Sequence, residues 1–335
     1  MSLDQEKLQS VLEKLMISDG KHSEYNAMAV EKENWIVKEL SKFWGATFNG
    51  LSVKGTYLDR AKWKTCDEFD LHLKLKLPFP ITPRKDDKGF VFLYAGIYKH
   101  EIVVDNYVNR KRLNDWFLSK LQSFKSYNNN FQYTANENGR THTLKYIQSN
   151  IDISFDLVPA FQFTWDQLPL DLDLPPISAE VGSDMLWLAV PHTKRGSSGD
   201  ERTFMVCSPH YEREATKDLK NFNNVLRLMK GVRDAHVDDF PQLSSYMLKT
   251  VLLHQLGRVD WNSDLATLFL EMWSCLVDHL NSGHMDFFLS KGNNIFDDMQ
   301  CREFHECRIS AERLLADFKN AASYNSLWLH RTFNV

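Results

Sequence analysis

Three acidic residues on two predicted strands have the types and spacing of a metal site. Glu68 and Asp70 lie on the polar face of the alternating run "EFDLHLKL", and Asp152 begins the polar face of a second run, "NIDISFDL". Successive residues of a strand point to opposite faces, so the three carboxylates converge if these strands are neighbours in one sheet. Clustered carboxylates repel one another, and divalent cations usually offset that repulsion. The alternative is an ordinary solvated strand face.

The chemistry that such a site could perform is nucleotidyl transfer. Oxygen-only ligands favour Mg²⁺ or Mn²⁺, and two such ions about 4 Å apart can activate an attacking hydroxyl and stabilise a leaving phosphate oxygen. A Gly-Thr pair, Gly55 and Thr56, precedes the first two carboxylates. Glycine lets a backbone approach a triphosphate closely, and the amide groups and the hydroxyl can donate hydrogen bonds to its oxygens.

The surrounding pattern predicts an α+β protein of two lobes. A long helical pattern ends at Gly45, and short alternating runs then occupy about 49–163 around one helix at 112–123. Pro159 is expected to end the second carboxylate strand. Helical patterns follow at 219–232, 243–256, 265–280 and 301–318. Because 335 residues exceed the usual size of one core, we expect a mixed-sheet lobe with a long N-terminal spine helix at 1–200 and a helical lobe at 201–335.

The composition and charge restrict location and partners. With 43% hydrophobic and 25% charged residues, the chain has the composition of a folded soluble protein. No apolar run approaches the length that spans a bilayer, and "MSLDQEKLQS" lacks the pattern of a secretory signal. We therefore expect the cytosol or nucleus, with the cytoplasm preferred, and no membrane partner. The net charge of −4 means that a nucleic acid would have to be held by local basic clusters.

The five cysteines indicate reduced thiols, since they form no CxxC pair and no even disulfide framework. Cys301, His305 and Cys307 are close enough in sequence to suggest a metal-ligand set. A fourth ligand is not apparent, so a pair of half-buried thiols is favoured over a structural zinc.

Several phrases of the sequence also carry a family resemblance. The order Gly-Thr, Glu-x-Asp and a later strand Asp resembles that of the polymerase-β-like nucleotidyltransferases, and the wider wording is similar to cyclic GMP-AMP synthase and the cGAS-like receptors. The phrases are "GTYLDRAKWKTCDEFDLHLKLKLP", "NIDISFDL", "WLAVPHTKRGSSGDERTF", "LRLMK" and "LSSYMLKT". The resemblance implies a bilobal nucleotidyltransferase fold and an innate immune enzyme that joins ATP and GTP into a cyclic dinucleotide of the cGAMP type. It also implies two Mg²⁺ or Mn²⁺ ions and a product read by a STING-type receptor.

The resemblance assigns roles to single residues. It implies metal ligands at Glu68, Asp70 and Asp152, a phosphate-holding turn at Gly55 and Thr56, donor-phosphate contacts from Lys230 and Ser245, a base-stacking ring at Tyr246, and a place for Ser154 in the nucleotide site. Without the resemblance, Lys230 is more simply a solvated helix lysine and Tyr246 a core aromatic residue. Thr56 stands where the family usually has serine, which keeps the hydroxyl.

The activator is implied by a departure from the vertebrate enzyme. The vertebrate synthase has a zinc-binding, DNA-binding insertion where "ATKDLKNFNNV" here contains no Cys or His, so no zinc is expected. The zinc-free cGAS-like receptors imply double-stranded RNA, which is recognised through phosphates and 2′-hydroxyls by Lys and Arg. Candidate contacts, each equally well explained as solvated surface, are Arg84, Lys85, Arg110, Lys111, Arg112, Lys194 and Arg195. Two alternatives stay open: a constitutive enzyme that makes a linear product, and a catalytically silent ligand-binding scaffold of the same fold.

Overall fold

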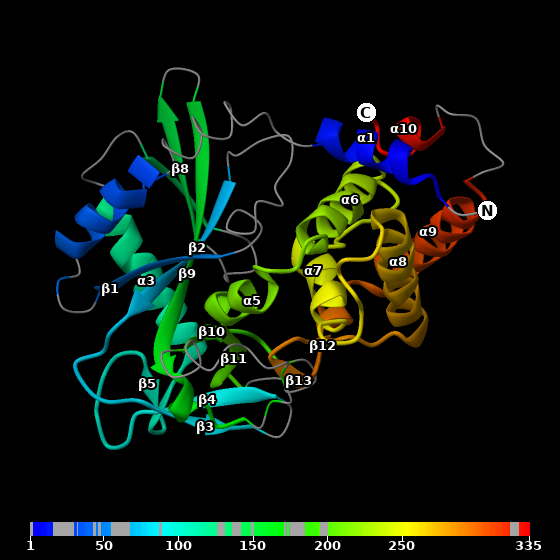
Figure 1. Ribbon diagram of the computed structural model, residues 1–335. Helices are drawn as coiled ribbons and strands as arrows, with labels where there is room; N and C mark the ends of the chain where they lie inside the picture. Colours follow the sequence, from blue (N-terminus) through cyan, green and yellow to red (C-terminus); the bar gives the residue numbers. More distant parts are fainter. Residues whose placement is uncertain are drawn as a thin grey trace. The chain divides into compact units, whose positions relative to one another are not determined.

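The computed structural model describes residues 3–15, 30–31, 33–42, 45, 48–54, 68–86, 89–125, 131–135, 142–148, 151–170, 172, 174, 185–194, 200–321 and 328–335. Across these residues the chain divides into two compact units (Figure 1). The described residues from 30 to Tyr211 form the sheet unit. Helix α1 (Gln5–Leu15) and the described residues from Glu212 onward form the helical unit.

The sheet unit is built on one mixed sheet. Its strands are β1 (Phe48–Lys54), β2 (Glu68–Leu75), β3 (Thr82–Lys85), β4 (Phe90–Tyr94), β5 (Val103–Val104), β6 (Tyr107–Val108), β7 (Phe131–Ala135), β8 (His142–Gln148), β9 (Ile151–Thr164), β10 (Leu186–Pro191) and β11 (Thr203–Cys207). Within the described residues the order is β1-β2-β9-β10-β11-β4-β6-β5, with β3 on β4 and the β7–β8 pair on β9. Strands β2 and β9 are parallel, and β9 is antiparallel to both β8 and β10. The expected α+β fold with a mixed sheet is confirmed.

The core of this unit follows the alternation seen in the sequence. Leu71, Leu73 and Leu75 of β2 are at most 3% exposed, and their register partners on β9 include the buried Leu157 and Phe161. In a parallel pair, register partners stand on the same face, so these apolar residues make one layer. The polar alternates of the same strands must then lie on the opposite face.

The prediction that Pro159 ends the second carboxylate strand is wrong. Strand β9 continues through Pro159 to Thr164, and Pro159 is paired with Leu73 of β2. On its other side, β9 pairs with β8 up to Leu157 and with β10 from Phe161 onward. Among the described residues no antiparallel partner is paired with Pro159, so the missing N–H breaks no ladder hydrogen bond there.

Helices accompany the sheet where the pattern predicted them. Helix α3 (Arg110–Lys125) covers the helix expected at 112–123 and contacts β7. Of the expected spine helix, residues 33–42 are helical, and Gly45 beyond them has a φ of 51° that glycine adopts readily. The short helix η2 (Trp165–Gln167) follows β9 in the chain, and the short helix α5 (Pro209–Thr216) follows β11.

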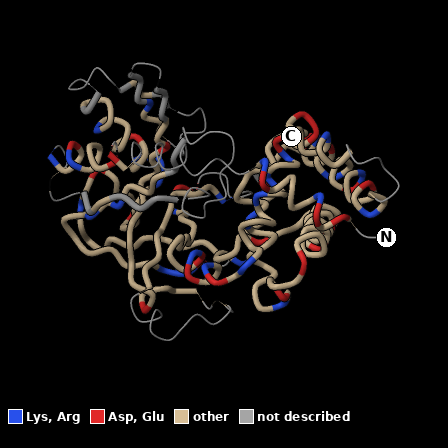
Figure 2. The backbone as a smooth tube through the Cα atoms, turned by 45° about the horizontal axis from the view of Figure 1, so that its top comes forward, with Lys and Arg blue, Asp and Glu red and all other residues tan. Residues whose placement is uncertain are grey.

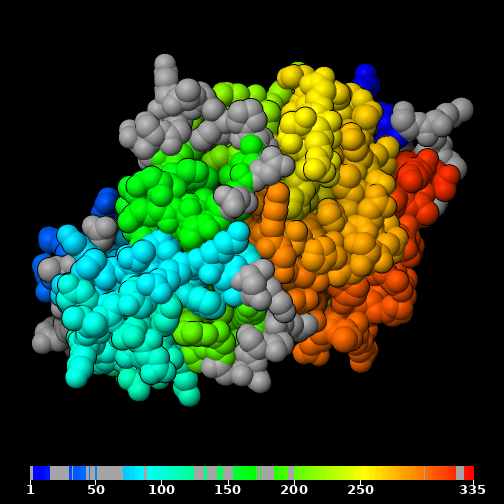
Figure 3. All heavy atoms as spheres, turned by 90° about the horizontal axis from the view of Figure 1, so that it is seen from below, coloured from blue at the N-terminus to red at the C-terminus, as the bar shows by residue number. Residues whose placement is uncertain are grey.

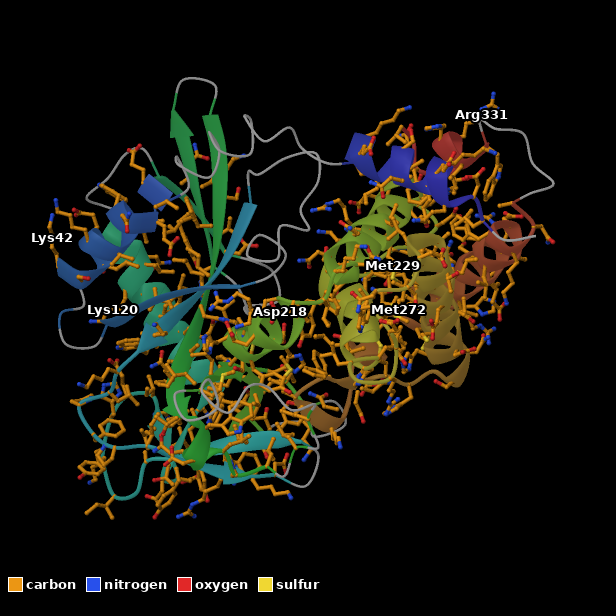
Figure 4. The ribbon with its side chains drawn as sticks, viewed as in Figure 1. Lys42, Lys120, Asp218, Met229, Met272 and Arg331 are labelled. Carbon is orange, nitrogen blue, oxygen red and sulfur yellow. The ribbon has the colours of Figure 1, made fainter. Side chains whose placement is uncertain are left out.

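The helical unit contains the four helices that the sequence predicted after residue 200. Its elements are α1, α6 (Phe222–Ala235), α7 (Ser245–Leu253), α8 (Leu265–Ser282), β12 (Asp286–Phe287), β13 (Ser290–Asn294), η3 (Ile295–Asp298), α9 (Cys301–Lys319) and α10 (Trp328–Thr332). Helices α8 and α9 lie side by side (Figures 1 and 3), and Trp273 Nε1 donates to Ala311 O at 3.1 Å between them. Met229 of α6 and Met272 of α8 are both fully buried in this unit (Figure 4).

The N-terminal helix belongs with the helical unit, whereas we expected residues 1–200 in one lobe. Helix α1 buries Leu8, Val11, Leu12 and Leu15 and packs on α6, α8 and α10. A Cβ on Gly231 of α6 would lie 2.7 Å from Leu15 Cδ1, so glycine lets the Leu15 side chain of α1 pack closely on α6. No helix of the described chain is long and apolar enough to cross a membrane.

Candidate active site

The register of β2 and β9 places the acidic residues of the sequence motif together. Glu68 is paired with Ser154, and Asp70 with Asp156. Asp152 precedes Ser154 by two residues, which is one full strand period, so all three acidic positions lie on one face of the sheet. Ordinary sheet spacings put the Cα atoms of Glu68 and Asp152 about 8 Å apart and those of Asp70 and Asp152 about 14 Å apart. The acid that the register places directly beside Asp70 is Asp156, which the sequence analysis did not select.

A further acid on this face has a structural partner. Asp156 of β9, half-buried, accepts a hydrogen bond from Thr143 Oγ1 of β8 at 2.5 Å. Ser154, between Asp152 and Asp156, is half-buried on the same face. A place for Ser154 in a nucleotide site stays a prediction.

Two lysines flank the acidic positions in register, and sequence reasoning missed both. Lys54 of β1 is paired with Asp70, and Lys145 of β8 is paired with Ser154. Cross-strand partners share a face, so each flanking strand places a lysine position on the face of the acidic positions. The spacing in the sequence contained no signal for this, because the pairing of β1 and β8 is decided only in the folded sheet.

The donor set fits Mg²⁺ or Mn²⁺. The proposed ligands are all carboxylates, and hard divalent cations prefer oxygen ligands. Among the described residues, no group of three or more His, Cys, Asp or Glu side chains is placed to hold a metal ion. Gly55, Thr56 and Arg195, three further predicted site residues, lie outside the described residues.

Two of the three residues considered as zinc ligands, Cys307 and His305, make other contacts. Cys307 is fully buried, and its thiol donates to Pro241 O at 3.2 Å. Burial, assisted by Glu303 and Glu306, raises the pKa of the Cys307 thiol to about 12, which disfavours the thiolate that zinc requires. His305 Nδ1 accepts from the Arg308 guanidinium at 3.2 Å, and Cys301 is exposed.

In the helical unit, Tyr246 stands at the start of α7 next to a buried ion pair. Its hydroxyl donates to Glu212 Oε1 of α5 at 3.2 Å, and Lys249 Nζ lies 2.9 Å from Glu212 Oε2. The side chains of Glu212 and Lys249 are each 5% exposed. Tyr246 itself is half-buried, and its ring stacks on Phe287 at a centroid distance of 6.2 Å. A role of Tyr246 in base stacking stays a prediction.

Ser245 is oriented as a hydrogen-bond donor. Arg233 Nη1 donates to Ser245 Oγ at 3.0 Å and to Leu243 O at 3.3 Å. A guanidinium has no acceptor, so the Ser245 oxygen accepts and its own proton can be donated elsewhere. Ser245 also begins α7, whose N-cap Ser244 accepts from Met247 N at 3.1 Å. The helix N-terminus adds a field that favours an anion at this position.

Lys230 differs from the alternative that the sequence left open. It lies on α6 and is only 3% exposed, so it is not a solvated helix lysine. Burying an ammonium group is costly unless other groups stabilise it, and a buried lysine is therefore a stronger candidate for a specific role than a surface one.

The structure separates the predicted nucleic-acid contacts into two groups. Arg110 Nη2 lies 2.8 Å from Glu201 Oε2, and Lys194 Nζ lies 2.6 Å from Asp86 Oδ2; each cation is at most 15% exposed. These two residues are held by acids of their own unit and are poorly placed to bind phosphate. The other described candidates are exposed: Arg84, Lys85, Lys111 and Arg112.

The exposed candidates have distinct surroundings. The Arg84 guanidinium stacks over the Tyr94 ring at 3.5 Å. Lys111 and Arg112 lie in the first turn of α3, which contains no acidic residue. Figure 2 shows that basic and acidic residues are otherwise interspersed along the backbone.

Comparison with known proteins matches both units. Residues 57–169 match the Mab-21 protein nucleotidyltransferase domain, and residues 221–313 match the Mab-21 protein HhH/H2TH-like domain. The chain is 42% identical to a "Cyclic GMP-AMP synthase-like protein" of Drosophila melanogaster over 342 residues, which is 98% of this chain and 97% of that protein. It is 27% identical to a "Cyclic GMP-AMP synthase-like receptor" of Drosophila eugracilis, covering 87% of this chain and 84% of the relative. A receptor of the same description from Lucilia cuprina is 25% identical, over 98% and 96%.

Proposed function

The chain belongs to the cGAS-like nucleotidyltransferases of the Mab-21 family, and from this we propose that it joins ATP and GTP into a cyclic dinucleotide of the cGAMP type when double-stranded RNA activates it. The observation that carries the proposal is the parallel register of β2 and β9, which sets Glu68, Asp70 and Asp152 on one face. The similarity to cyclic GMP-AMP synthase-like relatives supports the choice of product.

In the proposed reaction the three carboxylates hold two Mg²⁺ or Mn²⁺ ions. When bound, these ions neutralise charge on the transferring phosphoryl group and on the leaving oxygen. A ribose hydroxyl of one nucleotide attacks the α-phosphorus of the other, a new P–O bond forms, and the bond to pyrophosphate breaks. Asp152 helps to accept the hydroxyl proton. A second turn of the same chemistry closes the ring.

Residues of the chain bind and orient the triphosphates. Gly55 and Thr56 are proposed to hold phosphate oxygens in a turn, as the resemblance implies. The Ser245 hydroxyl, with its oxygen occupied by Arg233, donates its proton to a phosphate oxygen. The buried Lys230 offsets triphosphate charge, and the ring of Tyr246 stacks on a nucleobase.

We propose that the activator binds at the start of α3. Basic residues in the first turn of a helix oppose its dipole and cost stability, yet α3 carries Lys111 and Arg112 there, exposed and with no acid in that turn. A helix start that carries this unfavourable charge is expected at a functional site. A phosphate bound there would satisfy both the cations and the helix N-terminus. This supports a polyphosphate backbone such as that of double-stranded RNA.

The product and the location follow from the same proposal. A cyclic dinucleotide released in the cytoplasm acts only through a receptor, and a STING-type receptor is the proposed reader. The enzyme itself needs no membrane contact for this chemistry.

One experiment tests the proposal. Purified protein is incubated with the four nucleoside triphosphates and Mg²⁺ or Mn²⁺, with double-stranded RNA, matched DNA or neither, and products are identified by mass. We expect a mixed-base cyclic dinucleotide, formed most rapidly with RNA. A linear product, equal rates with and without nucleic acid, or no product from any combination would each contradict a named part of the proposal.

A further inference from the structure

Two hydroxyl side chains of the sequence directly precede a proline: Thr82 in "TPRK" and Ser208 in "SPHY". A hydroxyl residue followed by proline is the acceptor pattern of proline-directed protein kinases, and one class of these enzymes also selects a basic residue three positions after the acceptor. Thr82 is followed at that distance by Lys85, whereas Ser208 is followed by a tyrosine. The sequence around Thr82 therefore has the complete pattern.

The structure separates the two hydroxyl groups further. Thr82 begins β3 and is exposed. Ser208 is fully buried, and its Oγ donates to Leu186 O at 2.8 Å and accepts from Tyr211 N at 3.2 Å. A kinase must bring the acceptor hydroxyl into line with the γ-phosphate of ATP, which a buried and doubly bonded hydroxyl cannot reach. Of the two, Thr82 is the accessible acceptor.

The strand that carries Thr82 can be presented to another enzyme. Strand β3 lies at an edge of the sheet and pairs with β4 and, within the described residues, with no other strand (Figure 1). It has only four residues, so it can leave the edge without breaking the remaining strand pairs. This matters because Pro83 is buried in the folded strand and a proline-directed kinase must contact it. The backbone of β3 is already extended.

The side chain beside Thr82 on the same face of β3 is Arg84, two residues further on. Thr82 is the register partner of Tyr94, and the Arg84 guanidinium lies 3.5 Å from the centre of the Tyr94 ring. Arg84 Nη1 also donates to the Tyr107 hydroxyl at 3.3 Å. Residues two apart on a strand have Cα atoms about 7 Å apart, a separation that a phosphothreonine and an arginine can span together.

Arg84 has the chemistry of a phosphate ligand. It is exposed, and its contacts with the described residues are to aromatic rings and a hydroxyl, with no carboxylate among them. A guanidinium can donate two parallel hydrogen bonds to one phosphate group. A phosphate carries a charge of about −1.5 to −2 at neutral pH, so it attracts the guanidinium more strongly than an exposed tyrosine ring does.

We propose that Thr82 is a phosphorylation site for a proline-directed kinase that selects a basic residue three positions after the acceptor, and that Arg84 binds the resulting phosphate. In the transfer, Thr82 Oγ attacks the γ-phosphorus of ATP held by the kinase. A new O–P bond forms, the bond to ADP breaks, and a carboxylate of the kinase accepts the hydroxyl proton. The proposal goes beyond the proposed function and does not depend on it.

The modification has a consequence for the basic surface. Arg84 and Lys85 are both exposed and both predicted RNA contacts. A phosphate on Thr82 would place negative charge beside them and occupy Arg84, which opposes binding of a polyphosphate backbone. If the proposed function holds, the phosphorylated protein therefore needs more RNA for the same stimulation.

The first test asks whether Thr82 is the acceptor. The intact protein is incubated with ATP, with or without a cyclin-dependent kinase, and the modified residue is located by mass spectrometry of its fragments. We expect one phosphoryl group, on Thr82, formed only when the kinase is present. Thr82→Ala should remove it, and Lys85→Ala should slow it about tenfold by deleting a charge-assisted contact.

Ser208 is the matched control within the same chain, since it also precedes a proline. It should stay unmodified in the wild type and in Thr82→Ala. Absence of a phosphoryl group on Thr82, or equal modification of Ser208, would overturn the proposal.

The second test asks whether Arg84 binds the phosphate. Arg84 occupies the position of the pattern that the kinase does not select, so Arg84→Ala should be phosphorylated at the wild-type rate. The second pKa of a phosphothreonine, measured by ³¹P NMR, should be about 5.5 or lower in the wild type and about 6 in Arg84→Ala, because a guanidinium favours the dianion. Arg302→Ala, which removes an exposed cation of the helical unit, should keep the wild-type value. Equal values in wild type and Arg84→Ala would remove Arg84 from the proposal.

The outcomes also separate this proposal from the proposed function. A protein that accepts a phosphoryl group on Thr82 but makes no cyclic dinucleotide with RNA contradicts the proposed function and leaves the modification site standing. A protein that makes the product with RNA but accepts no phosphoryl group on Thr82 overturns the modification site alone.

Discussion

The carboxylate face of the sheet unit and the buried cluster of Glu212, Tyr246 and Lys249 in the helical unit (the Glu212 cluster) both contain acidic residues, but in different surroundings. On the sheet, Glu68 and Asp70 of β2 lie beside Ser154 and Asp156 of β9, residues far apart in sequence that the parallel register brings together. In the helical unit, an acid of α5 meets two residues of a single turn of α7 and is neutralised by Lys249 inside the protein. A buried acid with its own cation is already neutralised, whereas acidic positions that share a face without a described cation partner are candidates to bind a cation from outside.

The largest effect is expected when a carboxylate of the sheet unit is replaced. Asp70→Asn or Asp152→Asn replaces a proposed metal ligand with a neutral near-isostere, and we expect product formation to fall at least about a thousandfold with the fold retained. Product mass and circular dichroism check the two parts of this expectation.

Asp156→Asn is the decisive comparison, because Asp156 lies on the same strand and face, accepts from Thr143, and is the register partner of Asp70. If Asp152 is the third ligand, Asp156→Asn should keep most of the activity and lose about 1 kcal/mol of unfolding free energy with the weakened hydrogen bond. Loss of activity in Asp156→Asn with activity retained in Asp152→Asn would assign the third metal ligand to Asp156.

The next effect concerns charge at the start of α3. The double variant Lys111→Glu, Arg112→Glu should abolish RNA stimulation while basal activity remains, because it adds repulsion toward phosphate at the proposed contact. Acidic residues suit a helix N-terminus, so the melting temperature should not fall. RNA stimulation of the wild type should also decrease steeply with salt.

Arg302→Glu serves as the control for this variant. Arg302 is also a cation in the first turn of a helix, α9, and is 88% exposed. Its reversal should leave RNA stimulation intact. Loss of stimulation in both variants would indicate a general effect of net charge.

A smaller effect is expected when the aromatic ring of the helical cluster is removed. Tyr246→Ala deletes the proposed stacking surface, and base stacking contributes on the order of 1 to 3 kcal/mol. Triphosphate affinity should therefore fall about 5- to 150-fold, measured by equilibrium binding. Unchanged affinity would remove Tyr246 from the nucleotide site and leave the Glu212 cluster without a role in binding.

Acid should weaken the sheet unit through a buried histidine. His142 of β8 is 2% exposed, and its ring nitrogens lie 2.6 Å from the Tyr133 hydroxyl and 2.8 Å from Asn114 Oδ1. Burial lowers the pKa of His142 from 6.5 to about 4. The unfolded chain then binds the proton first as pH falls, so stability is full above about pH 6.5 and decreases down to about pH 4, by about 2 to 3 kcal/mol.

Denaturant unfolding of the wild type and of His142→Gln across this range measures the contribution. The variant should show a flatter dependence on pH, since it has no titrating ring at this position. An equally steep loss in both proteins would assign the acid sensitivity to other groups.

The smallest effect distinguishes two cysteines. With a pKa of about 12, the buried Cys307 thiol is almost entirely protonated at pH 8, whereas Cys301 is exposed. Iodoacetamide should therefore label Cys301 in the native protein and spare Cys307, with activity unchanged. Labelling of Cys307 in the native protein, or stoichiometric zinc in metal analysis, would make Cys301, His305 and Cys307 a candidate metal site again.

Local patterns in the sequence were sufficient for the elements and for the acidic motif. The period of about 3.6 residues located α6, α7, α8 and α9 to within a few residues, and the period of two located β2. Both depend on neighbours in the chain, which every sequence displays. The acids Glu68, Asp70 and Asp152 were identified on the same basis, because each begins the polar face of an alternating strand.

Long-range pairing was decided only in the tertiary structure. It carried β9 past Pro159, brought Lys54 and Lys145 beside the acids, and joined α1 to the helical unit. It also withdrew Arg110 and Lys194 into ion pairs while Lys111 and Arg112 stayed exposed, although all four are basic residues of similar surroundings in sequence. Whether a charge is available to a ligand depends on which residue the fold places within about 4 Å of it, and residues distant in the chain supply that partner.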